Sequence, residues 1–190
     1  MGRSRLTPER EAELYAAVLD LLREVGYDAL TMDAVAARTR ASKATLYRQW
    51  QGKPELVAKA LDHYKPVRIA DIDTGTLRGD LHAMVAEDDD CRMEQDSALI
   101  RGLAQAAHCN ADLHRALRDL LIGPEINALD AMLARAVERG EVPADRPALG
   151  YVPHMMIGAF VAQQLIEDRP PNRAFLTDYI DAVVLPALGV

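Results

Sequence analysis

Hydrogen-bonding and cationic side chains gather in one short stretch of this chain. Ser42, Lys43, Thr45, Tyr47 and Arg48 lie close together, and no Asp or Glu occurs from residue 34 to residue 54. Arginine can bind guanine through two hydrogen bonds, and hydroxyl and ammonium groups bind phosphate oxygens. These residue types at this spacing indicate recognition of a polyanion, and duplex DNA is the polyanion that fits them.

The distribution of charge supports this interpretation. The 190 residues carry a formal net charge of -7. Residues 1–65 hold 11 Lys and Arg against 9 Asp and Glu, a net of +2, whereas residues 66–190 hold 11 against 20, a net of -9. An acidic C-terminal part repels DNA, so we expect the DNA-binding surface in the N-terminal part.

The composition indicates an all-α protein. Hydrophobic residues make up 49% of the chain, which argues against disorder, and long alternations of Val, Ile and Thr are missing. Neither a signal peptide nor an apolar stretch long enough to cross a membrane is recognisable, so we expect a cytoplasmic protein without membrane contact. Two cysteines, Cys91 and Cys109, do not form a disulfide framework in a chain of this length.

Short helices must position the polar cluster. Thr7 suits the cap of a first amphipathic helix, which we expect to end at Gly26. Thr31 is the expected cap of a second helix and Ser42 of a third, with a tight turn between them. Pro54 then opens a fourth helix. The segment 31–50 is therefore predicted to be a helix-turn-helix unit.

The rest of the chain is predicted to form a second helical domain. We expect a DNA-binding domain at residues 7–66 and a larger domain at residues 67–190, with about nine helices in all. Gly123-Pro124 should kink or interrupt a helix, and Gly140 should end one.

The residues of the third helix divide into those expected in the core and those expected to contact DNA. Leu46 and Trp50 are expected in the core. Ala44 is small enough to let the helix approach the groove floor, and Arg48 suits a bidentate contact with guanine. Tyr47 suits a phosphate, and the alternative is that it packs against the core.

This stretch resembles the TetR family of bacterial transcriptional regulators, named for the tetracycline repressor. The resemblance rests on Gly26-Tyr27, Leu30-Thr31-Met32, Val35-Ala36, the run from Ser42 to Arg48, and Lys53. It implies a dimer that binds operator DNA, with phosphate contacts from Thr31, Tyr47 and Lys53. We therefore expect DNA contacts from Thr31, Arg40, Ser42, Lys43, Ala44, Thr45, Tyr47, Arg48, Gln49 and Lys53.

The match departs from the family pattern at three positions. Arg40 stands where the family usually has Gly, and a left-handed backbone there would cost about 1 kcal/mol unless the turn takes another shape. Gln49 replaces a common His or Tyr, so the operator preference of relatives cannot be carried over. Trp50 stands where Phe is usual.

The resemblance further implies that the last two helices pair with those of a second copy. Small residues would permit close helix approach and apolar residues would extend the contact. The expected homodimer interface comprises Gly158, Ala159, Ala162, Leu165, Ile166, Phe175, Tyr179 and Val183.

The resemblance also implies a cavity for a largely apolar small-molecule effector. Ordinary core packing is the alternative for its methionines. No histidine pair has metal-ligand spacing, and Asp88-Asp89-Asp90 beside Cys91 is interpreted as a solvated loop, so no metal or cofactor is expected. The expected cavity residues are Tyr64, Met84, Leu103, Leu121, Met132, Met155 and Phe160.

The function predicted from these features is a dimeric transcriptional repressor that a small molecule releases from its operator. One alternative is a DNA-binding regulator without an effector. Another is a helical enzyme, but no Ser-His-Asp, Cys-His or glycine-rich phosphate-binding arrangement appears in the sequence. We therefore do not expect catalysis.

Overall fold

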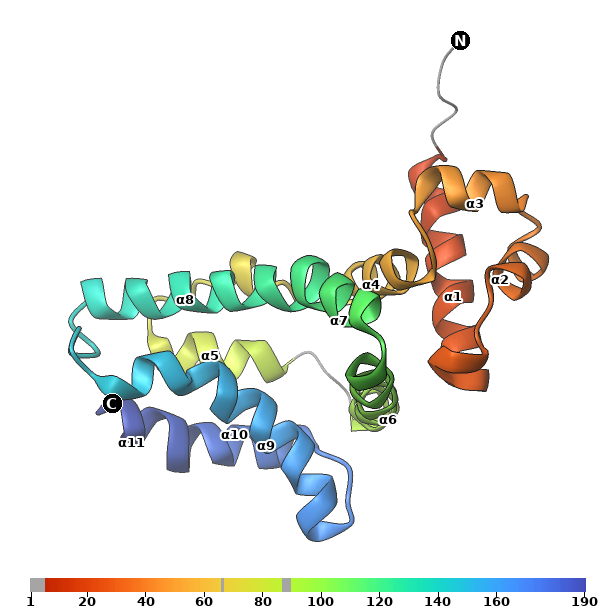
Figure 1. The fold of residues 1–190 in the computed structure, drawn as a ribbon. Helices are drawn as coiled ribbons and strands as arrows, with labels where there is room; N and C mark the ends of the chain where they lie inside the picture. Colours follow the sequence, from red (N-terminus) through yellow and green to blue (C-terminus); the bar gives the residue numbers. More distant parts are fainter. Residues whose placement is uncertain (1–5, 66, 87–89) are drawn as a thin grey trace. The chain divides into compact units, whose positions relative to one another are not determined.

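The structure is a computed structural model that describes residues 6–65, 67–86 and 90–190. Within these residues it contains helices and no strand, which confirms the predicted all-α class (Figure 1). The helices are α1 (Pro8–Ala29), α2 (Met32–Thr39), α3 (Lys43–Gln49), α4 (Lys53–Tyr64), α5 (Leu77–Ala86), α6 (Asp90–Cys109), α7 (Ala111–Leu117), α8 (Gly123–Glu138), α9 (Val152–Glu167), α10 (Arg173–Tyr179) and α11 (Leu185–Leu188). Short 3₁₀ segments lie at η1 (Ile69–Asp71) and η3 (Pro147–Tyr151).

Two helices continue through a wider π turn. The turn η2 (Arg118–Ile122) joins α7 to α8, and η4 (Ile180–Val184) joins α10 to α11. When each joined run is counted as one helix, the described residues form nine helices, which agrees with the number expected.

Each π turn ends two residues before a proline. The N–H of Gly123, the residue before Pro124, donates to the Arg118 carbonyl five residues earlier. The wider turn removes the clash that a proline ring otherwise makes with the preceding turn of an α-helix. The helix is therefore not interrupted at Gly123-Pro124. The same arrangement precedes Pro186.

The helices pack into two compact units. The first combines the described residues up to Lys65 with Leu99–Pro124, and the second combines those from Val67 to Ala98 with Glu125–Val190. In the first unit, α1 packs on α2 and α4, and α4 packs on α7. The DNA-binding domain at residues 7–66 and the larger domain at residues 67–190 are defined by function, so the boundary between them stays a prediction.

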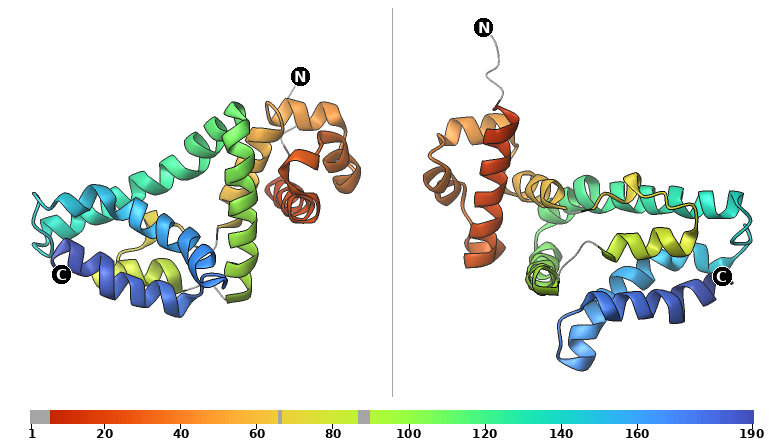
Figure 2. Two further views of the ribbon diagram at one scale, coloured as in Figure 1. Left: turned by 60° about the horizontal axis from the view of Figure 1, so that its bottom comes forward. Right: turned by 180° about the vertical axis from the view of Figure 1, so that it is seen from behind.

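In the second unit the C-terminal helices pack on α5 and α9. Figure 2 shows the run formed by α10 and η4 beside α5, and α10 also contacts α9. The buried residues at the centre of this unit include Leu81, Met132 and Ile180, each with 0% of its surface exposed. These side chains come from α5, α8 and η4, so one core joins segments that are far apart in the sequence.

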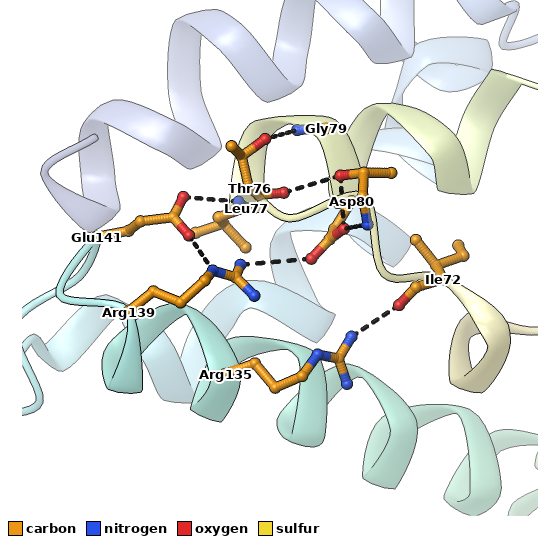
Figure 3. A network of polar contacts seen from close by, with 9 residues as sticks. Ile72, Thr76, Leu77, Gly79, Asp80, Arg135, Arg139 and Glu141 are labelled. Carbon is orange, nitrogen blue, oxygen red and sulfur yellow. Dashed lines mark hydrogen bonds and ion pairs between the residues drawn. The ribbon is translucent and has the colours of Figure 1, made fainter.

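A network of charged and polar groups holds the start of α5 against the end of α8 (Figure 3). Asp80 is fully buried, and its carboxylate accepts hydrogen bonds from the Thr74 N–H (2.6 Å) and hydroxyl (2.7 Å). Arg139 lies 3.5 Å from the other carboxylate oxygen. Glu141 accepts a hydrogen bond from the Leu77 N–H at 2.7 Å. These partners offset the cost of burying the Asp80 charge.

Candidate nucleic-acid interface

Side-chain caps fix the starts of α2 and α3. The Thr31 hydroxyl accepts a hydrogen bond from the Ala34 N–H at 3.1 Å, and the Ser42 hydroxyl accepts one from the Thr45 N–H at 3.1 Å. The hydroxyls of Ser42 and Thr45 are also 2.9 Å apart. Both predicted caps are confirmed, and the Thr45 hydroxyl is held in place on the first turn of α3.

The turn between α2 and α3 has Arg40 in a left-handed conformation, with φ 52° and ψ 33°. The next residue, Ala41, donates its N–H to the Ala36 carbonyl at 3.0 Å and so closes the end of α2. Glycine usually occupies such a position, because a side chain there costs about 1 kcal/mol. The Arg40 side chain is exposed and, among the described residues, makes no hydrogen bond or ion pair.

Two buried side chains anchor α3 to the first unit. Leu46 is 0% exposed and Trp50, directly after α3, is 2% exposed. The Trp50 indole N–H donates to the Tyr15 hydroxyl on α1 at 3.3 Å, and the two rings pack edge to face. Tyr15 donates in turn to Glu11 at 2.8 Å. Burial raises the pKa of Tyr15, so it keeps this donor proton.

The opposite face of α3 is open to solvent. Lys43, Ala44, Tyr47 and Arg48 are exposed, as are Thr31 and Ser42, whereas Thr45 and Gln49 are partly buried. Tyr47 is 55% exposed, which argues against the alternative that it packs in the core. The buried residues and the candidate DNA-contacting residues thus lie on opposite sides of one short helix.

The cations of this unit differ in the contacts that they make. Lys43 forms an ion pair with Asp33. Lys53 donates to the Tyr27 carbonyl at 2.9 Å and lies 4.1 Å from the centre of the Tyr27 ring, and burial lowers the pKa of Lys53. Arg48 makes no hydrogen bond or ion pair within the described chain. Arg48 is therefore available to DNA, whereas Lys43 and Lys53 already have partners.

Six of the eight predicted dimer residues line one groove of the second unit. Leu165 is 77% exposed and Ile166 is 79% exposed, which is unusual for side chains of this size. A groove of about 290 Å³ runs between α9 and α10. Val183 is 40% exposed outside this groove. The predicted residues that line the groove are Gly158, Ala159, Ala162, Ile166, Phe175 and Tyr179.

The predicted cavity residues belong to two separate hydrophobic cores. Tyr64, Leu103 and Leu121 belong to the core of the first unit. Met84, Met132, Met155 and Phe160 belong to that of the second. Met132 is 0% exposed, so it serves there as a packed core residue.

In residues 6–65, 67–86 and 90–190, no three His, Cys, Asp or Glu side chains lie together in a way that would hold a metal ion. None of the helices described has the length and apolarity needed to cross a membrane. The acidic run interpreted as a solvated loop, residues 88 to 90 with Cys91, lies outside the residues whose side chains are described.

Family models match both parts of the chain. Residues 14–60 match the model for bacterial regulatory proteins of the tetR family, and residues 71–183 match the model for a tetracyclin repressor-like C-terminal domain. The chain belongs to the TetR family. The predicted membership is confirmed, and the protein is a DNA-binding transcriptional regulator.

Individual relatives support this assignment. The chain of this TetR-family regulator is 36% identical over 179 residues to a DNA-binding transcriptional repressor, TetR, from Mycobacteroides abscessus, and the match covers 93% of this chain and 92% of the relative. It is 35% identical over 181 residues to an uncharacterised helix-turn-helix-type regulator from Mycobacterium tuberculosis, covering 94% and 88%. The crystal structure of a TetR family transcription regulator superposes with a TM-score of 0.67 at 29% identity, covering 93% and 97%.

Sequence reasoning about this TetR-family regulator did not identify two residues that contact the predicted DNA-binding side chains. Asp33 pairs with Lys43, and Tyr27 holds Lys53. Asp33 could have been noticed, because it is the last acidic residue before a long stretch without any. The contact between Tyr27 and Lys53 joins residues 26 positions apart and leaves no local signal.

Proposed function

We propose that this regulator is a dimeric repressor that inserts α3 into the major groove of its operator. The observation that carries the proposal is the division of α3 into a buried face, with Leu46 and the adjoining Trp50, and an exposed polar face. A helix anchored in this way can enter the groove with its first turns against the base edges.

Base recognition is assigned to residues of α3 that lie away from its buried face. Arg48 is proposed to contact guanine, because its guanidinium has no partner among the described residues. Thr45 offers a methyl group to thymine, and Ala44 permits close approach. Gln49 is partly buried at the end of the helix and contributes at the edge of the site.

Phosphate contacts are assigned to residues around this reading face. Thr31, Ser42 and Tyr47 supply hydroxyl groups, and Arg40 and Lys43 supply charge. The last proposed phosphate ligand, Lys53, must turn away from the Tyr27 carbonyl to reach DNA. Part of its electrostatic attraction to phosphate therefore offsets the loss of that hydrogen bond.

The homodimer is proposed to form through α9 and α10. Their exposed surface combines Leu165 and Ile166 with the groove that contains Gly158 and Ala162. Burying such side chains against a second copy removes apolar surface from water. A two-fold dimer would present two α3 helices to half-sites about 34–36 Å apart, or a multiple of that spacing.

Release by a small molecule is the regulatory part of the proposal. An effector that binds residues 67–190 and prefers the form unable to bridge both half-sites by about 3 kcal/mol would weaken operator binding roughly a hundredfold. The alternative is a regulator without an effector. A protein with this function works in the cytoplasm, where bacterial operators are found.

Selection of binding sites from a randomised duplex pool tests the proposal. The expected product is an inverted repeat with two half-sites, each protected in footprinting. A single unrepeated site would contradict the dimeric arrangement, and the absence of any enriched sequence would contradict operator recognition by α3. A screen of apolar compounds against the selected duplex then separates an effector-controlled repressor from the alternative.

A further inference from the structure

One carboxylate lies at the DNA-facing end of the helix-turn-helix unit. Asp33 is the only acidic residue between positions 31 and 54, and it forms an ion pair with Lys43, the first residue of α3. Both side chains are well exposed, at 65% for Asp33 and 59% for Lys43. The pair therefore stands where the phosphates of a duplex would approach α3.

Folding gains only modestly from this placement. An exposed ion pair contributes little to stability, because water screens it and two flexible side chains must be ordered. A carboxylate in the first turn of α2 interacts well with the helix dipole, but it repels a polyanion brought to the same surface. Asp33 thus acts against DNA binding at the residue that opens the recognition helix.

We propose that Asp33 determines specificity by withholding the charge of Lys43 from DNA that lacks the operator sequence. Binding to arbitrary duplexes depends almost entirely on cations that displace counterions from phosphates. A Lys43 neutralised by Asp33 displaces fewer of them. At the operator, base contacts from Arg48 compensate for separating the pair. The inference rests on the proposed placement of α3 against DNA.

A second ion pair in the same unit provides a matched control. Arg38 on α2 donates to both carboxylate oxygens of Glu24 on α1, at 2.7 and 3.1 Å. It has the same charges and a similar exposure, 43% for Arg38 and 50% for Glu24. Neither of its residues lies on α3. Neutralising Glu24 therefore changes the net charge as much as neutralising Asp33 does, without freeing Lys43.

The test compares Asp33→Asn and Glu24→Gln in the full chain. Fluorescence anisotropy gives the affinity for the selected operator and for a random duplex of equal length over a range of salt concentrations. Asp33→Asn should strengthen binding to the random duplex more than binding to the operator, and should steepen the salt dependence on the random duplex by about one unit for each bound α3. Glu24→Gln should leave the salt dependence unchanged. Equal salt dependence of the parent and Asp33→Asn on the random duplex would overturn the inference.

Lys43→Gln separates this inference from the proposed function. In a chain that carries Lys43→Gln, Asp33→Asn should no longer steepen the salt dependence, because no Lys43 ammonium remains to be freed. If Asp33→Asn acts equally with and without Lys43, the carboxylate only repels DNA and the inference fails. If Lys43→Gln alone changes neither the affinity for the operator nor its salt dependence, the proposed placement of α3 fails as well. Thermal melts monitored by circular dichroism establish that every variant is folded.

Discussion

The exposed face of α3 and the exposed face of α9 with α10 differ in polarity. On α3, polar and cationic side chains such as Tyr47 and Arg48 project from a helix anchored by Leu46. On α9, the large exposed side chains are Ile157, Leu165 and Ile166, and no Asp, Glu, Lys or Arg occurs from position 147 to position 166. The first surface suits phosphate and base edges, and the second suits another apolar surface.

The two regions also use their charges differently. In the second unit, Asp80, Arg139 and Glu141 bind one another or backbone groups, and Asp80 is fully buried. In the helix-turn-helix unit, Arg40 and Arg48 are exposed and make no ion pair among the described residues. Charge therefore joins segments of the second unit, whereas Arg40 and Arg48 of the helix-turn-helix unit carry charge that no described residue neutralises.

The largest expected effect comes from removing the anchor beneath the reading face. Trp50→Ala should lower the free energy of unfolding by about 3–5 kcal/mol, because it deletes a buried ring and leaves a cavity. Urea unfolding measures the change. DNA binding should be lost through unfolding of the first unit. A variant that unfolds like the parent would show that α3 does not depend on this anchor.

A charge on the apolar face should break the proposed dimer and spare the fold. Ile166→Glu should weaken self-association by roughly a hundredfold or more, because the carboxylate would be buried without a partner. The free energy of unfolding of the single chain should change by less than about 0.5 kcal/mol. Analytical ultracentrifugation measures the association. Val25→Glu, at a site 47% exposed on α1, is the control and should leave it unchanged.

Truncating the proposed base reader should alter selectivity more than stability. Arg48→Ala should reduce discrimination at one or two positions of each half-site by about 1–3 kcal/mol. Binding to a library of operator variants measures this loss. Arg38→Ala removes an arginine that is paired with Glu24 and should keep the parent's preferences. Identical preferences in Arg48→Ala and the parent would remove Arg48 from the reading face.

Arg40→Gly tests both the steric cost of the left-handed backbone and the proposed phosphate contact of Arg40. Arg40→Gly should raise the free energy of unfolding by about 1 kcal/mol, because glycine accepts the positive φ freely. It should also reduce the salt dependence of DNA binding by about one unit per half-site if Arg40 contacts a phosphate. Arg40→Lys keeps both the charge and the strained backbone and should resemble the parent in both measurements.

The smallest expected effect concerns Glu141, whose carboxylate is bound by other groups of the second unit. Burial acts to raise the pKa of Glu141, but the hydrogen bonds from the Leu77 N–H and Arg139 outweigh it and leave the pKa below its ordinary value of 4.5. A carboxyl group with a lowered pKa stabilises the fold above its unfolded-state value, and this contribution is lost as the pH falls through the folded-state pKa. The difference in unfolding free energy between the parent and Glu141→Gln should therefore shrink below about pH 4.5. A constant difference would contradict this role.

Local features of the fold could be read from the sequence. The caps at Thr31 and Ser42 depend on hydrogen bonds to residues three positions ahead, so the pattern that predicts them lies within one helical turn. Leu46 and Trp50 are predicted in the core, and their burial confirms this. The π turn before Pro124 was not predicted, because bonding to the fifth residue back has no distinct sequence pattern.

Features that depend on distant residues could not be read in the same way. Whether Lys53 points to solvent or to Tyr27 is decided by packing between α1 and α4. The apolar residues expected around one cavity, such as Leu103 and Met132, belong to different cores. Hydrophobic spacing identifies the inward face of a helix but does not say which neighbour that face meets.

The left-handed backbone at Arg40 has a consequence for how the DNA affinity of such a regulator could change during evolution. Most side chains without a branch at Cβ carry a similar steric cost in this conformation. Exchange of Arg40 for Lys, Gln or Glu would therefore alter the charge presented to DNA while leaving the stability of the unit almost constant. Position 40 can drift among charges without first acquiring a compensating change elsewhere.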